Sequence, residues 1–363
     1  MSDFVLAKKI QFFRLQLISI LCVVALLQGA TAATCGYTEI STVYSCNPLI
    51  ANSSTEPSLF TITGSHEIGK TDFDVVNLRA DNSTIERFPL EILIKFVRLE
   101  HLSMSHVEMK TISKLENCGS LTRLTLFLNQ ISVIASQTFE ACLNLVELDL
   151  ARNMLSSVNS NWFSISNRLE LLFLDTNAIT SIGKDDFTLL INLKTLHLSD
   201  NKISAIDEEA FDSVAKLEQL YMAHNELTVI NPRMFQSLTN LKTFSVLSNQ
   251  IASVPAFTSL TNLNNLYLTD NRLTSLDALT FSGLGNLKVL QVVANEIQEL
   301  PQNIFNGLTN LDILAFSSNK ITEIGAVIFT PLVNLYRFEF NDNRIKKVDP
   351  DAFNQQTKLE VYG

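Results

Sequence analysis

The sequence predicts a repeat protein of the solenoid type rather than a conventional globular domain. In "LKTLHLSDNKISAIDEEAF", the apolar residues from Leu193 to Phe211 follow neither helical spacing nor simple alternation, and Asn201 lies among them. Asparagine then recurs with a step of 24 residues, shortened once to 22, at Asn129, Asn153, Asn177, Asn201, Asn225, Asn249, Asn271, Asn295, Asn319 and Asn343. A parallel phenylalanine series comprises Phe139, Phe163, Phe187, Phe211, Phe235, Phe257, Phe281, Phe305, Phe329 and Phe353. A fixed period of this length is typical of stacked repeats.

The repeated segment resembles the leucine-rich repeat family, whose pattern is LxxLxLxxNxL. "LVELDLARNML" begins at Leu145 and "LEQLYMAHNEL" at Leu217, and residues 71–363 hold about twelve such units plus a partial thirteenth. In the two weakest units, Ser83 and Val107 replace the asparagine. The resemblance implies an α/β repeat solenoid, a right-handed horseshoe with a parallel β-sheet on its concave face. The convex side is then irregular or short-helical, and a β-rich cap precedes the first repeat.

Elementary physics agrees with this fold. Leu196 and Leu198 alternate inward from a short strand, so the residues between and beside them point outward. The chain must turn after the strand, which leaves backbone polar groups inside the coil. Asn201 carries both donors and an acceptor for those groups, so we expect a buried asparagine ladder whose loss costs about 1–3 kcal/mol per residue. Phe211 and its equivalents are expected to stack along the convex side.

The start of the chain reads as a secretory signal peptide at residues 1–33. Lys8, Lys9 and Arg14 precede the apolar run "LQLISILCVVALL", and "ATAA" supplies small residues for cleavage. The alternative is an uncleaved anchor helix, but this run is short for a bilayer span. We therefore expect a secreted, extracellular protein with an N-terminal cap at 34–70 and no later membrane span. The formal net charge of -10 argues against a nucleic-acid or acidic-lipid partner.

Four cysteines remain after Cys22 leaves with the predicted signal. Cys35 and Cys46 flank a β-rich stretch, and a disulfide between them would staple the cap. Cys118 and Cys142 lie 24 residues apart at one place in successive repeats, so their backbones should be neighbours. Either they form a second disulfide or they are two buried free thiols in leucine positions.

Motifs for catalysis do not occur in this sequence. It lacks GxSxG, HExxH, a glycine-rich phosphate loop and CxxC, so we expect no enzyme activity, no cofactor and no metal site. The acidic runs at 185–186 and 207–209 are interpreted as a solvated convex face. Asn52 in "NSS" and Asn82 in "NST" are candidate glycosylation sites of a secreted chain.

Large side chains occupy several outward positions of the predicted concave strands. The candidate ligand-binding residues are Phe127, Phe173, His197, Tyr221, Leu247, Tyr267 and Val293. Apolar and aromatic side chains facing solvent indicate a protein-binding surface. The alternative is a concave sheet that tolerates scattered apolar residues. Twelve strands about 4.8 Å apart give an inner arc on the order of 55 Å, which suits a protein partner better than a small molecule.

A narrower resemblance covers the cap and first repeats. The order Cys35, Cys46, "NLRADNSTIERFP" and "LEHLSMSHVEMKTIS" is similar to secreted leucine-rich-repeat immune proteins of mosquitoes and other insects. That resemblance implies a role in recognising or escorting complement-like factors in haemolymph, although the cysteine-rich segment and coiled coil of that family are missing here. The expected function is therefore a secreted, non-catalytic recognition solenoid of insect innate immunity that binds a protein or pathogen-surface ligand. The alternative is part of the ectodomain of a cell-adhesion or guidance receptor, and an enzyme is a distant third.

The chain stops at Gly363 in mid-repeat. Leu359 and Tyr362 fall 24 residues after Leu335 and Phe338 and open a thirteenth strand. An uncovered strand edge and core invite association. We expect a truncated product, or self-association or a partner at this edge.

Overall fold

The computed structural model describes residues 71–81, 85–163 and 168–359 with their side chains, Asp74 excepted. It also describes the backbone alone of 19–27, 30–36, 45–46 and 61–65. The chain divides into two compact units. Unit 1 comprises Met1–Leu155 with Asn161–Leu169, and unit 2 comprises Ser156–Ser160 with Glu170–Gly363. Their short parallel strands form a parallel β-solenoid of about 11 turns with little helix, as predicted.

Unit 1 contains four concave strands among its described residues: β5 (Asn77–Ala80), β6 (His101–Ser103), β8 (Arg123–Thr125) and β10 (Glu147–Asp149). They pair in parallel with a fixed register, so that Leu102, Leu124 and Leu148 stack at their centres. A 3-10 turn, η1 (Asp72–Asp74), precedes β5, and α2 (Glu91–Lys95), β7 (Thr111–Ile112) and β9 (Val133–Ile134) lie between the concave strands in sequence. A further 3-10 turn, η2 (Ser160–Trp162), begins at the last residue of the short unit 2 segment and ends in unit 1.

The N-terminal region of unit 1 also contains strands. Its strands are β1 (Ser19–Leu27), β2 (Ala30–Gly36), β3 (Ser45–Cys46) and β4 (Thr61–Ser65). Strand β1 pairs with β2 and with β5, and it includes residues 19–27 of the apolar run in the predicted signal peptide. A strand assignment does not test cleavage, so the signal peptide at 1–33 and the cap boundaries at 34–70 stay predictions. Within the described part of the chain, no helix has the length and apolar character needed to cross a membrane.

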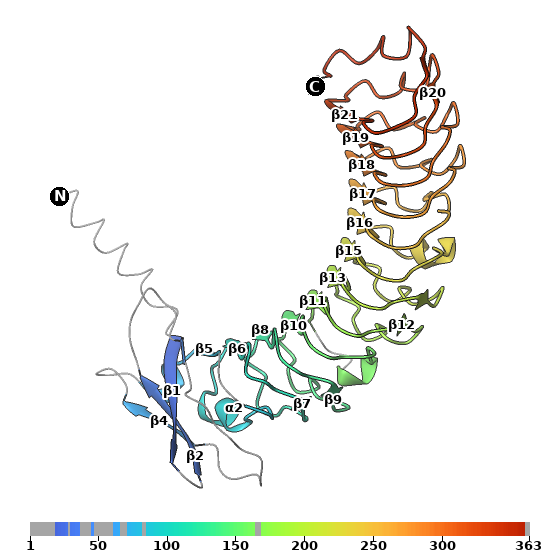
Figure 1. Cartoon of the computed structure of the whole chain (residues 1–363). Coiled ribbons are helices and arrows are strands. Elements are labelled where there is room, and N and C mark those ends of the chain that lie inside the picture. Colours follow the sequence, from blue (N-terminus) through green and yellow to red (C-terminus); the bar gives the residue numbers. More distant parts are fainter. Residues whose placement is uncertain are drawn as a thin grey trace, which may run out of the picture. The chain divides into compact units, whose positions relative to one another are not determined.

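Unit 2 continues the same construction, and Figure 1 shows its strands stacked side by side from β11 in green to β21 in red. The concave strands are β11 (Leu171–Phe173), β13 (Thr195–His197), β15 (Gln219–Tyr221), β16 (Thr243–Ser245), β17 (Asn265–Tyr267), β18 (Val289–Gln291), β19 (Ile313–Ala315) and β21 (Arg337–Glu339). The opposite side carries β12 (Ser181–Ile182), β14 (Ala205–Ile206), η3 (Pro232–Phe235), β20 (Glu323–Ile324) and β22 (Lys347–Val348). The predicted irregular convex side therefore also holds two-residue strands, which pair from one coil to the next.

The buried asparagine ladder is confirmed. Asn201 is 8% exposed, and its Oδ1 accepts a hydrogen bond from the Ile179 N–H at 3.0 Å. Its Nδ2 donates to the carbonyls of Leu174, Leu198 and Ser199 at 3.0, 3.1 and 3.2 Å. Each such side chain thus joins two successive coils, and it gives hydrogen-bond partners to backbone groups that the turn would otherwise leave unpaired. Val107 holds the asparagine position in the coil before Asn129, but it has no amide side chain to offer. Its backbone N–H still takes part in the ladder, because it donates to Asn129 Oδ1.

Backbone conformation around the ladder repeats as well. The residue before each ladder asparagine has φ between 53° and 57°, in the left-handed region, although none of these residues is glycine. They are Leu128, Arg152, Thr176, Asp200, His224, Ser248, Asp270, Ala294, Ser318 and Asp342. A left-handed residue costs roughly 1–2 kcal/mol for a side chain with a Cβ. The hydrogen bonds of the adjacent asparagine hold this conformation in every turn.

Members of the phenylalanine series pack ring against ring from one coil to the next, as predicted, face to face in three pairs and edge to face for Phe235 and Phe257. In unit 2, ring centroids lie 5.9 Å apart for Phe187 and Phe211 and 5.8 Å apart for Phe305 and Phe329. In unit 1, Phe139 stacks on Phe163 at 5.6 Å. These rings close the side of each coil opposite the leucines.

A second asparagine ladder was not predicted. It lies just before the concave strands and is exposed, and each Nδ2 donates to a backbone carbonyl of the preceding coil at 2.7–2.9 Å. Its members are Asn144, Asn240, Asn262, Asn286, Asn310 and Asn334. The signal was present in the sequence as a recurring asparagine two residues after an apolar position and directly before a leucine.

Cys118 and Cys142 form a disulfide, with Cα atoms 4.7 Å apart. The alternative of two buried free thiols was therefore wrong. The repeat register explains the outcome, because it places equivalent positions of adjacent coils about one strand spacing apart. The side chains of Cys35 and Cys46, and the candidate glycosylation sites Asn52 and Asn82, lie outside the described residues.

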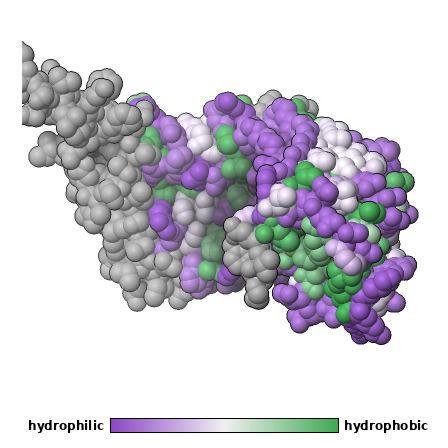
Figure 2. Space-filling view, turned by 90° about the horizontal axis from the view of Figure 1, so that it is seen from above, coloured by the Kyte–Doolittle hydropathy of each residue, from purple (hydrophilic) through white to green (hydrophobic). Residues whose placement is uncertain are grey.

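The C-terminal coils of unit 2 are less covered than the central ones. Phe338 and Phe353 are half-buried, whereas the equivalent Leu314 and Phe329 are fully buried. Figure 2, which looks down onto these coils, shows apolar side chains gathered in a patch with polar ones around it. Phe338 stacks on Phe340 at 4.3 Å, so part of this apolar surface is covered by its own rings.

Candidate functional site

Three of the predicted ligand-binding residues stack directly on one another in unit 2. Phe173, His197 and Tyr221 end successive strands and are register partners. The ring centroids of Phe173 and His197 are 4.8 Å apart, and those of His197 and Tyr221 are 4.5 Å apart. The interplanar angles are 31° and 26°. Because these distances match the spacing of neighbouring strands, the parallel register places the three side chains within stacking distance of one another. We call these three residues the ring ladder.

The ring ladder is interrupted at the next strand. Ser245 is the register partner of Tyr221 on one side and of Tyr267 on the other. Its small side chain is buried, with 7% exposure. Tyr267 therefore resumes the aromatic row two strands beyond Tyr221.

Polar side chains occupy the first position of the strands around Ser245. The Tyr221 hydroxyl donates to Gln219 Oε1 at 3.3 Å, and Asn265 Nδ2 donates to Thr243 Oγ1 at 3.2 Å. Burial raises the pKa of Tyr221, as does the neighbouring Tyr267, and a hydrogen bond with Thr243 opposes the rise. The Tyr221 phenol is thus protonated at neutral pH and fixed by its neighbours.

Sequence reasoning missed Gln219, Thr243 and Asn265 as part of this surface. The available signal was their position, two residues before the aromatic position of each strand. Their polarity is common at such a position, so nothing in the residue types distinguished them.

The surface around the ring ladder carries almost no charge. Among the three outward positions of each strand turn from Leu171 to Ser317, all of which are described, Asp175 alone has a formal charge. Burial lowers the pKa of His197 below its ordinary value of 6.5, and the Asp175 charge opposes that effect. His197 is therefore neutral at pH 7. Charged residues border the strip, and they pair with each other: Lys194 with Glu170 at 2.8 Å and Lys242 with Glu218 at 2.7 Å.

The remaining predicted residues occupy different places. Leu247 and Val293 are half-buried, each two residues after the end of a concave strand and two coils apart. Leu247 follows the strand of Ser245, and Val293 follows the strand beyond Tyr267. Phe127 belongs to unit 1, where the Arg152 guanidinium lies over its ring at 5.6 Å. The structure thus joins Phe173, His197 and Tyr221 by contact and does not join Phe127 to them.

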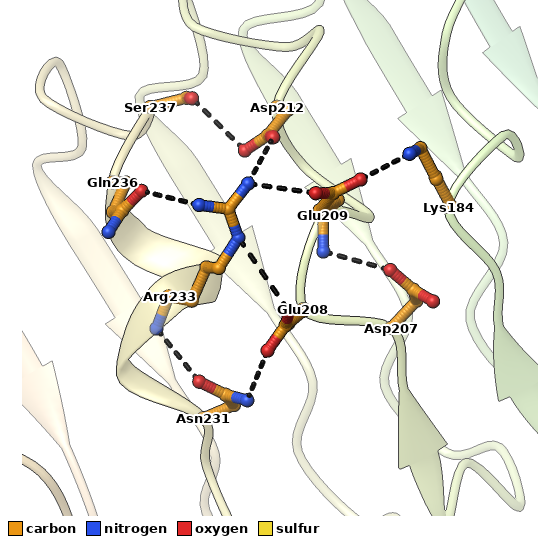
Figure 3. Close-up of polar contacts among 9 residues, drawn as sticks. All are labelled: Lys184, Asp207, Glu208, Glu209, Asp212, Asn231, Arg233, Gln236 and Ser237. Carbon is orange, nitrogen blue, oxygen red and sulfur yellow. Dashed lines mark hydrogen bonds and ion pairs between the residues drawn. The ribbon is translucent and has the colours of Figure 1, made fainter.

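The acidic run at 207–209 is more ordered than a solvated face. Arg233, on η3, lies 2.9 Å from Glu209, 3.5 Å from Asp212 and 3.8 Å from Glu208 (Figure 3). Lys184 pairs with Glu209 from the preceding coil. The hydrogen bond from Lys184 and its charge lower the pKa of Glu209, with Arg233 contributing less. This network ties coils together, and no group of side chains among the described residues is suited to bind a metal ion.

A model of the leucine rich repeat matches seven overlapping segments of the chain that together span residues 119–338. No curated protein matches the sequence. Several solved structures share the fold. A leucine-rich repeat protein of Leptospira interrogans is 28% identical with a TM-score of 0.70, over 80% of this chain and 73% of that one. A chain from the Drosophila Toll–Spätzle complex is 18% identical with a TM-score of 0.64, over 91% of this chain and 49% of that one.

Two further structures extend the comparison. A chain from the plant peptide hormone receptor RGFR1 in complex with RGF2 is 26% identical with a TM-score of 0.60, over 79% of this chain and 47% of that one. A chain from the complex of Latrophilin 3, Unc5D and FLRT2 is 23% identical with a TM-score of 0.63, over 80% of this chain and 94% of that one. With the repeat model matching more than half of the sequence and the observed parallel solenoid, the chain belongs to the leucine-rich repeat family.

Proposed function

We propose that this protein is a secreted, non-catalytic recognition solenoid of insect innate immunity that binds a protein ligand on the concave strip of unit 2. The observation that carries the proposal is the ring ladder. Phe173, His197 and Tyr221 stack in a row on an outward sheet face that is nearly free of charge. Aromatic side chains held in a fixed geometry supply binding energy with little loss of conformational entropy.

The comparisons support a protein ligand. The leucine-rich repeat family is generally non-catalytic, and similar structures come from complexes of a receptor with a peptide hormone and of Toll with Spätzle. The disulfide between Cys118 and Cys142 supports an oxidising compartment, in keeping with secretion. The immune role itself rests on the resemblance of the first hundred residues to secreted insect immune proteins.

The test begins with capture of partners from haemolymph by the purified chain and their identification by mass spectrometry. The double variant Phe173→Ala/Tyr221→Ala should then bind the captured partner about 30-fold or more weakly, the loss expected when interface hot spots are truncated. The matched control is Val229→Ala/Leu279→Ala, since these apolar side chains are 66% and 63% exposed away from the concave strip. Undiminished binding by the first variant together with loss in the second would place the site elsewhere.

The alternative is part of an adhesion or guidance receptor ectodomain, and the FLRT2 complex holds a chain of the same fold. Fold alone does not separate the two roles. Recovery of the native protein from washed membranes rather than from body fluid would favour the receptor.

Three features expected from the sequence remain part of the proposal. N-terminal sequencing of the secreted protein should begin at residue 34, and a glycosidase shift should report glycans at Asn52 and Asn82. Light scattering tests self-association through the C-terminal coils, and a monomer at high concentration would contradict it.

A further inference from the structure

His197 is the middle member of the ring ladder, and its side chain is of the type whose charge changes near neutral pH. Its ring centroid lies 4.8 Å from that of Phe173 and 4.5 Å from that of Tyr221. Phenylalanine does not titrate, and the raised pKa of Tyr221 keeps its phenol protonated at neutral and acidic pH. A change of charge in the ring ladder on mild acidification therefore comes from His197.

The side chains around His197 on the outward face are almost all uncharged. On its own coil and on the coils of β11 and β15 they are Thr195, Ser199, Gln219, Ala223 and Asp175. Burial lowers the pKa of His197, and the charge of Asp175 opposes this with a smaller effect. A proton on His197 is therefore poorly compensated by its neighbours.

Charged residues at the borders of these coils do not alter this. They are Glu170, Lys194, Asp200, Glu218 and His224. Glu170 and Lys194 pair with each other at 2.8 Å. None of the five contributes to the shift in the pKa of His197.

A charged His197 depends on water. Within the described part of the chain, neither imidazole nitrogen takes part in a hydrogen bond, and neither is completely buried. The neutral ring has one N–H donor, whereas the imidazolium has two and a full charge. A ligand that covers the ring ladder removes this water, and the loss is larger for the charged form. Phe173 and Tyr221 attract a cation over their faces with or without a ligand, so that attraction does not change the comparison.

We propose that the ring ladder is an acid-sensitive contact: when His197 takes up a proton, the protein ligand bound over Phe173, His197 and Tyr221 is released. This inference rests on the proposed function, since it describes how binding at that site is regulated. A ligand bound in neutral body fluid would be released in an acidified compartment.

Proton linkage sets the direction of the effect. His197 under a ligand has a lower pKa than uncovered His197, so the free protein binds more protons than the complex and acid favours the free protein. One such group weakens binding by at most about tenfold for each pH unit below its pKa in the free protein.

The first test needs no ligand and uses NMR on the full chain with nitrogen-15 in its histidines. In Phe173→Ala and in Tyr221→Ala, the pKa of His197 should rise from its wild-type value, because each change exposes one ring face to water. His224→Asn is the matched control: it removes an exposed imidazole on the next coil, asparagine tolerates the φ of 53° there, and the pKa of His197 should not change. If that pKa stays the same or falls in either ring variant, the rings do not disfavour the charge and the inference is overturned.

The second test uses the partner captured from haemolymph, after its identification and purification, and titration calorimetry at about pH 7.5 and about pH 5.0. The wild type and His224→Asn should bind it more weakly at the lower pH. For His197→Phe, which keeps a ring in the row without its proton, the ratio of the two dissociation constants should be at least about threefold smaller. If His197→Phe does not fold, His197→Asn replaces it. A folded His197 variant with the same ratio as the wild type would overturn the inference.

The double variant Phe173→Ala/Tyr221→Ala separates this inference from the proposed function. If it binds the partner more weakly at the higher pH while the wild type and the His197 variant share one ratio, this inference fails and the proposed function stands. If it binds as tightly as the wild type, the concave strip is not the binding site and both fail.

Discussion

Replacing Asn201 with alanine tests how the buried ladder holds successive coils together. The side chain makes four hydrogen bonds, three as a donor and one as an acceptor. All four involve backbone groups inside the coil. Alanine keeps the backbone and removes the whole amide.

The size of the effect follows from which groups keep another partner. The carbonyls of Leu174 and Leu198 also accept from Asn177 and Asn225, at 3.0 and 2.9 Å. The Ser199 carbonyl also accepts from the N–H of Thr176 at 2.9 Å. The Ile179 N–H, in contrast, donates to Asn201 Oδ1 at 3.0 Å and lies in the core.

A buried N–H that loses its acceptor lowers the stability of the fold by about 1–3 kcal/mol. We therefore expect Asn201→Ala to lower the free energy of unfolding of unit 2 by about that amount. For a region of this size, the loss corresponds to a fall in melting temperature of roughly 2–12 °C.

The assay is thermal unfolding followed by far-UV circular dichroism and by fluorescence of Trp162. Trp162 is the single tryptophan of the chain and is buried in unit 1, so its transition should move less than that of unit 2. The matched control is Asn240→Ala, which removes one exposed bond to the Ala215 carbonyl and should change stability by less than about 0.5 kcal/mol. Equal melting temperatures for the two variants would refute the ladder argument.

Three other predictions concern separate parts of the chain. NMR titration should place the pKa of His197 below 6.5. The native state then binds fewer protons than the unfolded state near that pH, so the free energy of unfolding should fall as the pH drops below 6.5. A pKa at or above 6.5 would contradict this. Changing Cys118 and Cys142 to serine should cost unit 1 about 3 kcal/mol in urea unfolding, reduced wild type should behave like the variant, and a variant as stable as the oxidised wild type would contradict the assignment. Ala294→Gly should be neutral or stabilising by up to about 1 kcal/mol because its φ is 53°, while Ala252→Gly should cost about 0.5–1 kcal/mol, and the reverse order of the two melting temperatures would be inconsistent with the backbone argument.

The arrangement of the scaffold could be predicted because each repeat meets its copy. In a parallel stack with a constant register, a residue contacts the one that follows it by one period. Asn201 therefore meets the turn before it, Phe187 meets Phe211, and Cys118 reaches Cys142. The same logic explains why the outward positions of Phe173 and His197 were identified correctly.

The sequence by itself thus determined the family, the strand positions, the buried ladder, the spine and the row on which the candidate site lies. The tertiary structure alone decided how the outward side chains are oriented: Phe173, His197 and Tyr221 stack, Gln219 and Thr243 hold a tyrosine, and an arginine from η3 pairs with the acidic run. Phe127 shares the sequence pattern, but it lies against Arg152 in the other unit. The physical reason is that periodicity fixes which backbones are adjacent, whereas side-chain contacts on a surface depend on rotamers and on neighbours that differ from coil to coil.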